Sequence, residues 1–294
     1  MGLADRNYHP ASGGRSPYSL VGSPVVKWLL IYNIGVFIVE LVAAGSGNTS
    51  TDYLFTKRYG MFSVQDAFHH GEIWRIITCQ FLHKDGQHLF ANMLGLFFFG
   101  RYVEQWWGSL KFLGFYFICG VAGPLLFTLL IYLPGFFPYS DVSRYMLGAS
   151  AGVYGVMIAV ALIAPNLRVL LFFFLPMSIR VLAFLMLGYS CLAVVFGLPN
   201  AGGEAAHLGG ALLGFILMKK PQLLSWLGGG ADRKRKQQRK KTIDRHRARE
   251  SKMKPRIEID LNDTKVDAIL DKVNREGIQS LTEKEKKILK KAAE

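Results

Sequence analysis

Residues 148–164 read GASAGVYGVMIAVALIA, an apolar run without a charged side chain. A helix needs roughly 20 apolar residues to cross a bilayer. Five more stretches approach or reach this length: 24–44, 88–100, 110–133, 181–198 and 205–218. A proline-broken apolar piece at 169–176 precedes the stretch at 181–198. Soluble proteins do not place six such runs in one short region with almost no charged faces between them. The sequence therefore predicts an all-α polytopic membrane protein, a bundle of six transmembrane helices.

Composition excludes several other classes of protein. Of the 294 residues, 51% are hydrophobic and 19% are charged, against about 25% charged in average soluble domains. The net charge is +14, but the residues from Lys219 onward carry 23 basic and 12 acidic side chains and account for most of it. This uneven distribution argues against a uniformly basic nucleic-acid-binding domain. The three cysteines, Cys79, Cys119 and Cys191, are far apart in sequence and indicate neither a disulfide framework nor a metal site.

Four regions follow from this distribution. Residues 1–23 are a polar N-terminus without the apolar core or cleavage site of a signal peptide. Residues 24–218 form the membrane domain, and residues 219–263 form a basic linker. Residues 264–294 form a small helical hairpin.

Helical periodicity predicts the hairpin. Apolar residues recur at the spacing of one helix face: Val266, Ile269, Leu270 and Val273. Gly277 would end this helix. Ser280 followed by Glu283 has the form of a capping box that starts a second helix. Because the hairpin is too small for an independent core, we expect it to dock on a partner.

Basic residues indicate the orientation in the membrane. Lys219, Lys220 and the run at 233–236 follow the last span, and cytoplasmic segments are enriched in Lys and Arg. We therefore predict a multi-pass protein of the cell's inner (plasma) membrane with both termini in the cytoplasm. The 13 basic residues of 232–256 indicate a solvated positive-inside stop signal, with contact to anionic lipid headgroups as the alternative. Nucleic acid is not expected as a partner.

With this topology, the second, fourth and sixth spans all start at the outer side of the membrane. Polar side chains within a membrane are functional candidates, and four lie at these starts: His88, Asn92, Ser150 and His207. His88 and Asn92 are four residues apart and share one helix face. Gly210 and Gly214 share a face with His207 and permit close helix packing. Together the four polar groups can supply a nucleophile, a base and an oxyanion site.

Each residue taken singly also has a structural explanation. Ser150 could bond a backbone carbonyl, and His207 could serve as an interhelical hydrogen-bond partner. A six-span bundle with polar interior residues could also be a transporter. A transporter would need inverted repeats or charged residues at the midplane, and the sequence has neither.

Four motifs over about residues 65–215 resemble those of the rhomboid family of intramembrane serine proteases. They are EIWRIIT at 72–78, FLH at 81–83 with His88 and Asn92, GAS at 148–150 with Tyr154, and AH at 206–207 with Gly210 and Gly214. One position departs from the family pattern, because many members have glycine directly after the nucleophile, where this chain has Ala151. The extra methyl group would narrow the site slightly. The C-terminal hairpin resembles the small cytoplasmic helical domain appended to some bacterial rhomboids.

The resemblance implies a serine endopeptidase that cleaves transmembrane segments near the outer membrane face with a Ser–His dyad and no carboxylate. Ser150 would attack the scissile carbonyl, and His207 would carry the proton. Tyr154 would orient the His207 ring, and Gly148 would help to position the substrate. His88, Asn92 and the Ser150 backbone N–H would stabilise the oxyanion.

The remaining expectations concern partners and neighbouring residues. Trp74 and Arg75 would anchor the outer loop in the membrane interface, while Glu104 and Glu204 fall at the edges of predicted spans. The partners implied are transmembrane protein substrates and the lipid bilayer, with no cofactor or metal. The alternative function is a catalytically silent rhomboid-like protein that binds and retains membrane proteins.

Overall fold

The computed structural model describes residues 22–45, 59–171, 174–227 and 263–292. The chain divides into two compact units, Met1–Gly229 and Gly230–Glu294, which are considered separately. The predictions for the N-terminus up to residue 21, and for the basic run within 228–262, lie outside the described residues.

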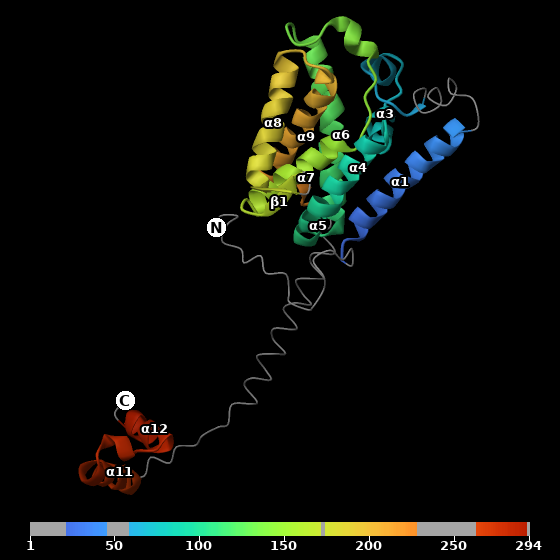
Figure 1. Ribbon diagram of the computed structural model, residues 1–294. Coiled ribbons are helices and arrows are strands. Elements are labelled where there is room, and N and C mark those ends of the chain that lie inside the picture. The colour runs from blue at the N-terminus through green and yellow to red at the C-terminus, as the bar shows by residue number, and fades with distance from the viewer. Residues whose placement is uncertain (1–21, 46–58, 172–173, 228–262, 293–294) are drawn as a thin grey trace. The chain divides into compact units, whose positions relative to one another are not determined.

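The first unit is a bundle of helices that follow the predicted apolar stretches (Figure 1). They are α1 (Pro24–Gly45), α4 (Gly86–Gly95), α5 (Arg101–Trp107), α6 (Ser109–Tyr132), α7 (Ser150–Ile163), α8 (Ile179–Val195) and α9 (Ala201–Lys219). By length and composition, α1, α6 and α9 are long and apolar enough to cross a membrane, and α7 and α8 are shorter apolar helices. Short elements connect them, namely η2 (Gln65–His69), α3 (Arg75–Thr78), η3 (Cys79–Phe81) and η5 (Tyr139–Ser143), and η6 (Pro221–Leu224) follows α9.

Two stretches differ from the simplest interpretation of the sequence. The stretch predicted at 88–100 is longer, because α4 continues through the π-helical segment η4 (Leu96–Gly100) into α5. The apolar piece at 169–176 is not helical. It forms an antiparallel pair of strands, β1 (Arg168–Leu171) and β2 (Leu175–Ser178), in which Leu171 pairs with Leu175. Pro176 interrupts helical hydrogen bonding and is tolerated on this two-stranded edge.

Small residues set the distance between α6, α7 and α9. A side chain at Gly210 of α9 would place its Cβ 2.0 Å from the carbonyl oxygen of Ala151 on α7. At Gly214, a Cβ would lie 2.7 Å from the Cα of Gly155 on α7. The close helix contact predicted from the Gly210 and Gly214 spacing is therefore confirmed. It holds the starts of α7 and α9 together.

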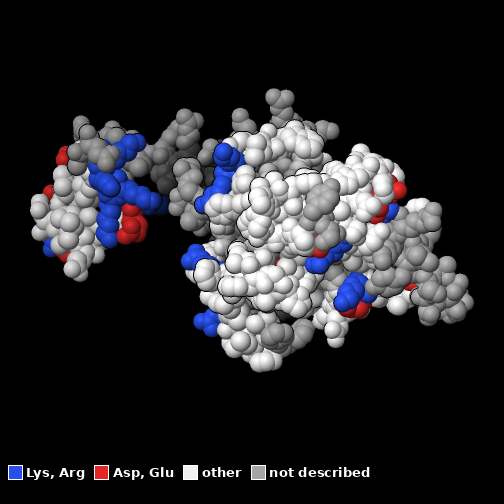
Figure 2. All heavy atoms as spheres, turned by 90° about the horizontal axis from the view of Figure 1, so that it is seen from above, with Lys and Arg blue, Asp and Glu red and all other residues white. Residues whose placement is uncertain are grey.

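The outer surface of the first unit is largely apolar. Large apolar side chains such as Val39, Val42, Phe184 and Phe196 are mostly exposed. Figure 2 looks down onto one end of the bundle, where the charged residues of the first unit form a few separate groups among uncharged residues. Soluble monomers rarely expose apolar surface of this extent, and this surface suits contact with lipid.

The second unit contains the predicted hairpin, formed by α11 (Asp263–Glu276), η7 (Ile278–Ser280) and α12 (Glu283–Ala292). The predicted helix end at Gly277 is confirmed, since this residue has a φ of 81°. The predicted capping box at Ser280 and Glu283 is wrong. The Ser280 hydroxyl donates to the Gly277 carbonyl at 2.7 Å within an additional 3₁₀ turn.

The box that starts α12 lies two residues further along the chain. The Thr282 N–H donates to Glu285 Oε2 at 2.7 Å, and the Glu285 N–H donates to Thr282 Oγ1 at 3.4 Å. The Thr282 hydroxyl also donates to Glu285 Oε2 at 2.7 Å. This bond foremost, then the Thr282 N–H and Lys272, lowers the pKa of Glu285 to about 2. The motif type was predicted correctly, but the 3₁₀ turn after Gly277 shifts its register.

Candidate active site

The structure joins Ser150 and His207, which are 57 positions apart in sequence. Ser150 is the first residue of α7, and His207 lies in the second turn of α9. Their side chains meet with His207 Nε2 2.8 Å from Ser150 Oγ. The small residues between α7 and α9 permit this approach, because a larger side chain at Gly210 would meet the backbone of Ala151.

Tyr154 fixes the plane of the His207 ring. It follows Ser150 by about one helical turn, and its ring stacks on that of His207 with centroids 4.2 Å apart and an interplanar angle of 14°. A stacked aromatic neighbour limits rotation of the imidazole about its side-chain bonds. The ring is thereby kept in an orientation that directs Nε2 to the serine.

Gly148 brings the loop before α7 against His88. Its φ of 127° is disfavoured for residues with a side chain. A Cβ at this position would also lie 2.7 Å from His88 Cε1. The Gly148 N–H donates to the Cys79 carbonyl at 2.8 Å, which ties this loop to the segment before α4.

His88 is held at the start of α4 by a helix cap. Asp85 is the N-cap residue, and its Oδ1 accepts from the His88 N–H at 2.8 Å. This hydrogen bond is the main cause that lowers the pKa of Asp85, so the cap stays ionised over the neutral pH range. The first turn of α4, and His88 with it, is fixed in place.

Asn92, like Tyr154, lies outside the cavity that the other predicted residues line. A cavity of about 410 Å³ is lined by His88, Gly148, Ser150 and His207, among others, and Asn92 is not in its lining. The Asn92 side chain is buried and donates from Nδ2 to the His88 carbonyl at 2.9 Å. It therefore supports the backbone of His88 one turn further along α4.

The remaining cavity wall includes small and basic residues beside larger side chains, among them Tyr145, Met146 and Leu147. Gly120, Pro124, Gly202 and Ala206 form much of its small-residue surface, and Lys84 and Arg144 contribute the charged groups. An extended peptide can approach Ser150 Oγ closely only where neighbouring side chains are small. The geometry thus presents a hydroxyl, an imidazole and a recess beside them.

Comparison with known proteins identifies the family. The family model for the Rhomboid domain matches residues 70–220, which is just over half of the chain. The chain belongs to the rhomboid family. Rhomboids are multi-pass membrane proteins and are generally intramembrane serine proteases. Residues 241–294 match a second model, a family of unknown function (DUF6576).

Individual rhomboids show the same relationship at modest identity. RHOMBOID-like protein 12, mitochondrial, of Arabidopsis thaliana is 32% identical over 201 residues, which are 65% of this chain and 56% of that protein. Rhomboid protease GluP of Bacillus subtilis is 29% identical over 196 residues, 66% of this chain and 34% of that protein. Inactive RHOMBOID-like protein 8 of Arabidopsis thaliana is 43% identical over 60 residues, 20% of this chain and 17% of that protein. The chain thus spans about half of the first relative and about a third of the second.

The departure of this rhomboid at Ala151 is accommodated by a neighbouring helix. Ala151 lines the cavity, but its methyl group also faces Gly123 on α6, where an added Cβ would lie only 2.7 Å away. The methyl group of Ala151 thus fills the space that a side chain at position 123 would need. The extra methyl group therefore belongs to the packing of α6 against α7 as well as to the cavity wall.

Sequence reasoning missed one member of this rhomboid's site. Glu204 Oε2 lies 2.9 Å from His207 Nδ1 and accepts a 2.6 Å hydrogen bond from the Ser190 hydroxyl on α8. The sequence suggested a last span from residue 205, with Glu204 at its edge, whereas α9 begins at Ala201. Glu204 is thus inside the first turn and on the same face as His207. The spacing of three residues was the signal that could have revealed this contact.

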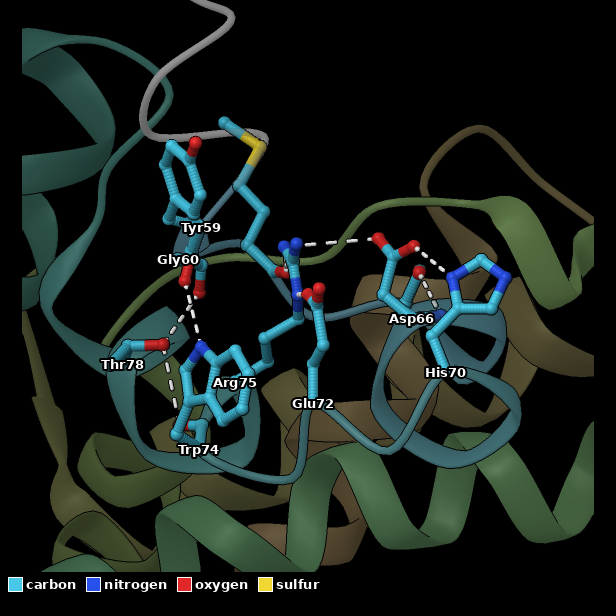
Figure 3. A network of polar contacts seen from close by, with 10 residues as sticks. Tyr59, Gly60, Asp66, His70, Glu72, Trp74, Arg75 and Thr78 are labelled. Atoms are coloured by element: carbon cyan, nitrogen blue, oxygen red, sulfur yellow. Dashed lines mark hydrogen bonds and ion pairs between the residues drawn. The ribbon is translucent and has the colours of Figure 1, made fainter.

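In this rhomboid, the loop that leads to α3 is held by a buried arginine (Figure 3). Arg75 donates from Nη1 to the Met61 carbonyl at 2.7 Å and from Nε to Glu72, and its Nη1 lies 3.7 Å from Asp66 Oδ2. The expectation that Arg75 anchors the loop in the membrane interface is wrong, because its side chain is only 3% exposed. The loop's own acidic and carbonyl groups surround it instead.

Trp74, next to this arginine, is half exposed and donates from Nε1 to the Tyr59 carbonyl at 3.1 Å. The neighbouring Thr78 hydroxyl donates to the Gly60 carbonyl at 2.9 Å. These contacts join the start of the described loop, at residues 59 and 60, to α3 (Figure 3). The segment that carries the family motif at 72–78 is therefore a rigid support next to the site.

Proposed function

We propose that this rhomboid is an intramembrane serine endopeptidase that cleaves transmembrane segments of membrane proteins near the outer membrane face. The observation that carries the proposal is the 2.8 Å contact between Ser150 Oγ and His207 Nε2 at the wall of a cavity. A nucleophile within hydrogen-bond reach of a base, which is itself held by a third group, is the arrangement that nucleophilic catalysis requires.

The reaction proceeds through two acyl-transfer steps. Ser150 Oγ attacks the scissile carbonyl carbon while its proton passes to His207 Nε2. The C–N bond then breaks, the same proton passes to the leaving amine, and an acyl ester remains on Ser150. Water attacks this ester and gives a proton to Nε2, which returns it to Oγ as the new carboxyl group leaves.

The oxyanion would be stabilised by donors at the start of α7 and on α4. The first N–H groups of a helix have no intrahelical acceptor, and Ser150 occupies the first position of α7. His88 lies beside Gly148 on the cavity wall. Asn92 would act mainly through the His88 backbone to which it donates, and Gly148 and Tyr154 position the substrate and the base.

For the topology we propose six spans with both termini in the cytoplasm of the inner (plasma) membrane, the continuous α4–α5 helix counting as one span. The support is that His88, Ser150 and His207 lie within the first two turns of α4, α7 and α9, whose starts lie at the same end of the bundle (Figure 1). Lys219, at the end of α9, is at the opposite end. The substrates would be transmembrane proteins, and the basic linker would contact anionic lipid headgroups.

A catalytically silent rhomboid is the second candidate, because a related protein carries the name Inactive RHOMBOID-like protein 8. The two functions can be separated with the purified full-length protein in detergent. An active enzyme should react with a fluorophosphonate probe at Ser150 and cleave a model transmembrane substrate, and Ser150→Ala should do neither. Absence of both labelling and cleavage in the unaltered protein would favour binding and retention.

A further inference from the structure

We propose that Glu204 is a positioning residue for the His207 base, so that this rhomboid operates a Ser–His–Glu triad within the membrane. The proposal rests on the protease function above. It starts from a chain of contacts: Ser150 Oγ to His207 Nε2 at 2.8 Å, and His207 Nδ1 to Glu204 Oε2 at 2.9 Å. The hydroxyl and the carboxylate thus lie on the two opposite nitrogens of one ring.

The carboxylate decides which ring nitrogen carries the proton. An ionised carboxylate only accepts hydrogen bonds, so the neutral His207 ring must keep its hydrogen on Nδ1 to bond Glu204. Nε2 then has its lone pair directed to the Ser150 hydroxyl and can accept its proton. The opposite tautomer would present an N–H to the serine and could not act as a base.

The surroundings hold this carboxylate in place. Glu204 is only 7% exposed, and a charge of this kind is costly to bury unless it is hydrogen-bonded. The fully buried Ser190 on α8 donates to Oε2 at 2.6 Å, and the Asn200 side chain donates to the same carboxylate. Glu204 also lies in the first turn of α9, where the helix dipole favours negative charge.

The carboxylate matters most when the ring becomes positively charged. After it takes the Ser150 proton, His207 is an imidazolium next to Glu204, in an apolar region where charge interactions are strong. Glu204 itself stays ionised and exchanges no proton with substrate. In soluble serine proteases, replacing the equivalent carboxylate by an amide stabilises the wrong tautomer and lowers kcat by about 10⁴-fold.

The test compares Glu204→Gln with Glu204→Asp in the full-length protein in detergent. Glu204→Gln preserves size and can still accept from Ser190, but its amide can donate to Nδ1. We expect it to lower kcat by about 10²-fold to 10⁴-fold with little change in KM, because the contact strengthens in the transition state. Glu204→Asp restores a carboxylate and should recover at least part of the loss.

Glu104→Gln is the matched control, since it makes the same change at another buried glutamate, on α5, outside the cavity. It should lower the thermal midpoint but leave kcat per folded molecule unchanged. Equal kcat losses in Glu104→Gln and Glu204→Gln would overturn the proposal, because the effect would then reflect folding alone. So would full kcat in Glu204→Gln, or an aspartate variant no better than the glutamine variant.

A spectroscopic measurement reports the tautomer of His207 directly, without relying on a change in activity. Because it is also made on the unaltered protein, it remains informative if a variant fails to fold. Nitrogen-15 chemical shifts of the His207 ring, assigned by its absence in His207→Gln, distinguish the two tautomers. We expect hydrogen on Nδ1 in the unaltered protein and a shift toward Nε2–H in Glu204→Gln. Hydrogen on Nε2 in the unaltered protein would overturn the triad, even if fluorophosphonate labelling and cleavage confirm the protease. A protein that neither labels nor cleaves would instead refute the protease function.

Discussion

The two ends of the helical bundle each contain a buried glutamate, and the two carboxylates have different partners. Glu104 on α5 is 1% exposed and accepts from the Val25 and Val26 N–H groups at 3.0 and 2.9 Å and from the Ser109 hydroxyl at 2.7 Å. Glu204, near the other end, accepts from the Ser190 hydroxyl and contacts the His207 ring.

Partners, rather than burial, separate the roles of these two carboxylates. Glu104 satisfies N–H groups at the start of α1 that have no acceptor within the helix, so it secures a packing contact between α1 and α5. Glu204 bonds a ring that can gain and lose a proton. A buried glutamate in an apolar bundle is therefore a functional candidate only when its contacts lead to a reacting group.

The largest expected effect is at the Glu204 end. Ser150→Ala and His207→Ala should each lower kcat by at least about 10⁴-fold, because nucleophile and base act as a unit. Both variants should insert in the membrane and keep a thermal midpoint close to that of the unaltered protein. Cleavage of a model transmembrane substrate measures the first effect, and thermal unfolding in detergent measures the second. Near-normal turnover by either variant would contradict a catalytic role for the Glu204 end of the bundle.

A smaller effect should separate His88 from Asn92. Removing an oxyanion donor costs about 10²-fold to 10³-fold in kcat, and we expect His88→Ala to fall in this range with a lesser change in KM. Asn92→Ala should reduce kcat less, since Asn92 donates to the His88 carbonyl and is outside the cavity lining. Steady-state kinetics on the same substrate will distinguish them. A larger loss in Asn92→Ala would mean that its amide reaches the oxyanion directly.

At the Glu104 end, the expected effect is on stability. Glu104→Ala leaves the Val25 and Val26 N–H groups without their acceptor, and an unsatisfied buried group costs about 1–3 kcal/mol. The free energy of unfolding should fall by an amount of this order, while kcat per folded molecule should not change. Glu104→Gln keeps one acceptor oxygen and should lose less. A selective loss of kcat in Glu104→Ala, without destabilisation, would show that this end also serves catalysis.

The smallest effect is expected from truncation after residue 230. In the proposed orientation the chain beyond this residue is cytoplasmic, and about 30 Å of hydrocarbon separates that face from the outer one. The truncated protein should retain its kcat in detergent, while its localisation or choice of partner in cells changes first. If a correctly inserted truncated protein loses all cleavage, the C-terminal region supports the active fold.

Much of the candidate active site could be predicted from sequence because its determinants are local. Ser150 among small residues, and His207 with Gly210 and Gly214 on one face, predicted two helices that approach closely. The start of α9 was harder to predict from sequence, because the glycines before Glu204 disfavour a helix. Packing overrides this preference: a Cβ at Gly202 would lie 3.0 Å from the Phe127 ring on α6.

Other features depend on how the backbone turns between the predicted elements. The burial of Arg75 follows from the Met61 carbonyl and Asp66, which only the folded loop brings to it. The cap of α12 depends on a 3₁₀ turn that places Thr282, and not Ser280, before the helix. In both cases the residue types indicated the kind of contact, and the local path of the backbone decided which residues made it.

The length of α7 has a consequence for where a substrate is cut. Its 14 residues rise about 21 Å, and the hydrocarbon core is about 30 Å thick. Placing the C-terminal end of α7 at the cytoplasmic boundary, in the proposed orientation, puts Ser150 roughly 9 Å below the opposite boundary. A substrate helix covers that depth in about six residues. The scissile bond should therefore lie about one and a half helical turns inside the apolar segment, and lengthening that segment on its outer side should move the cut relative to the substrate sequence.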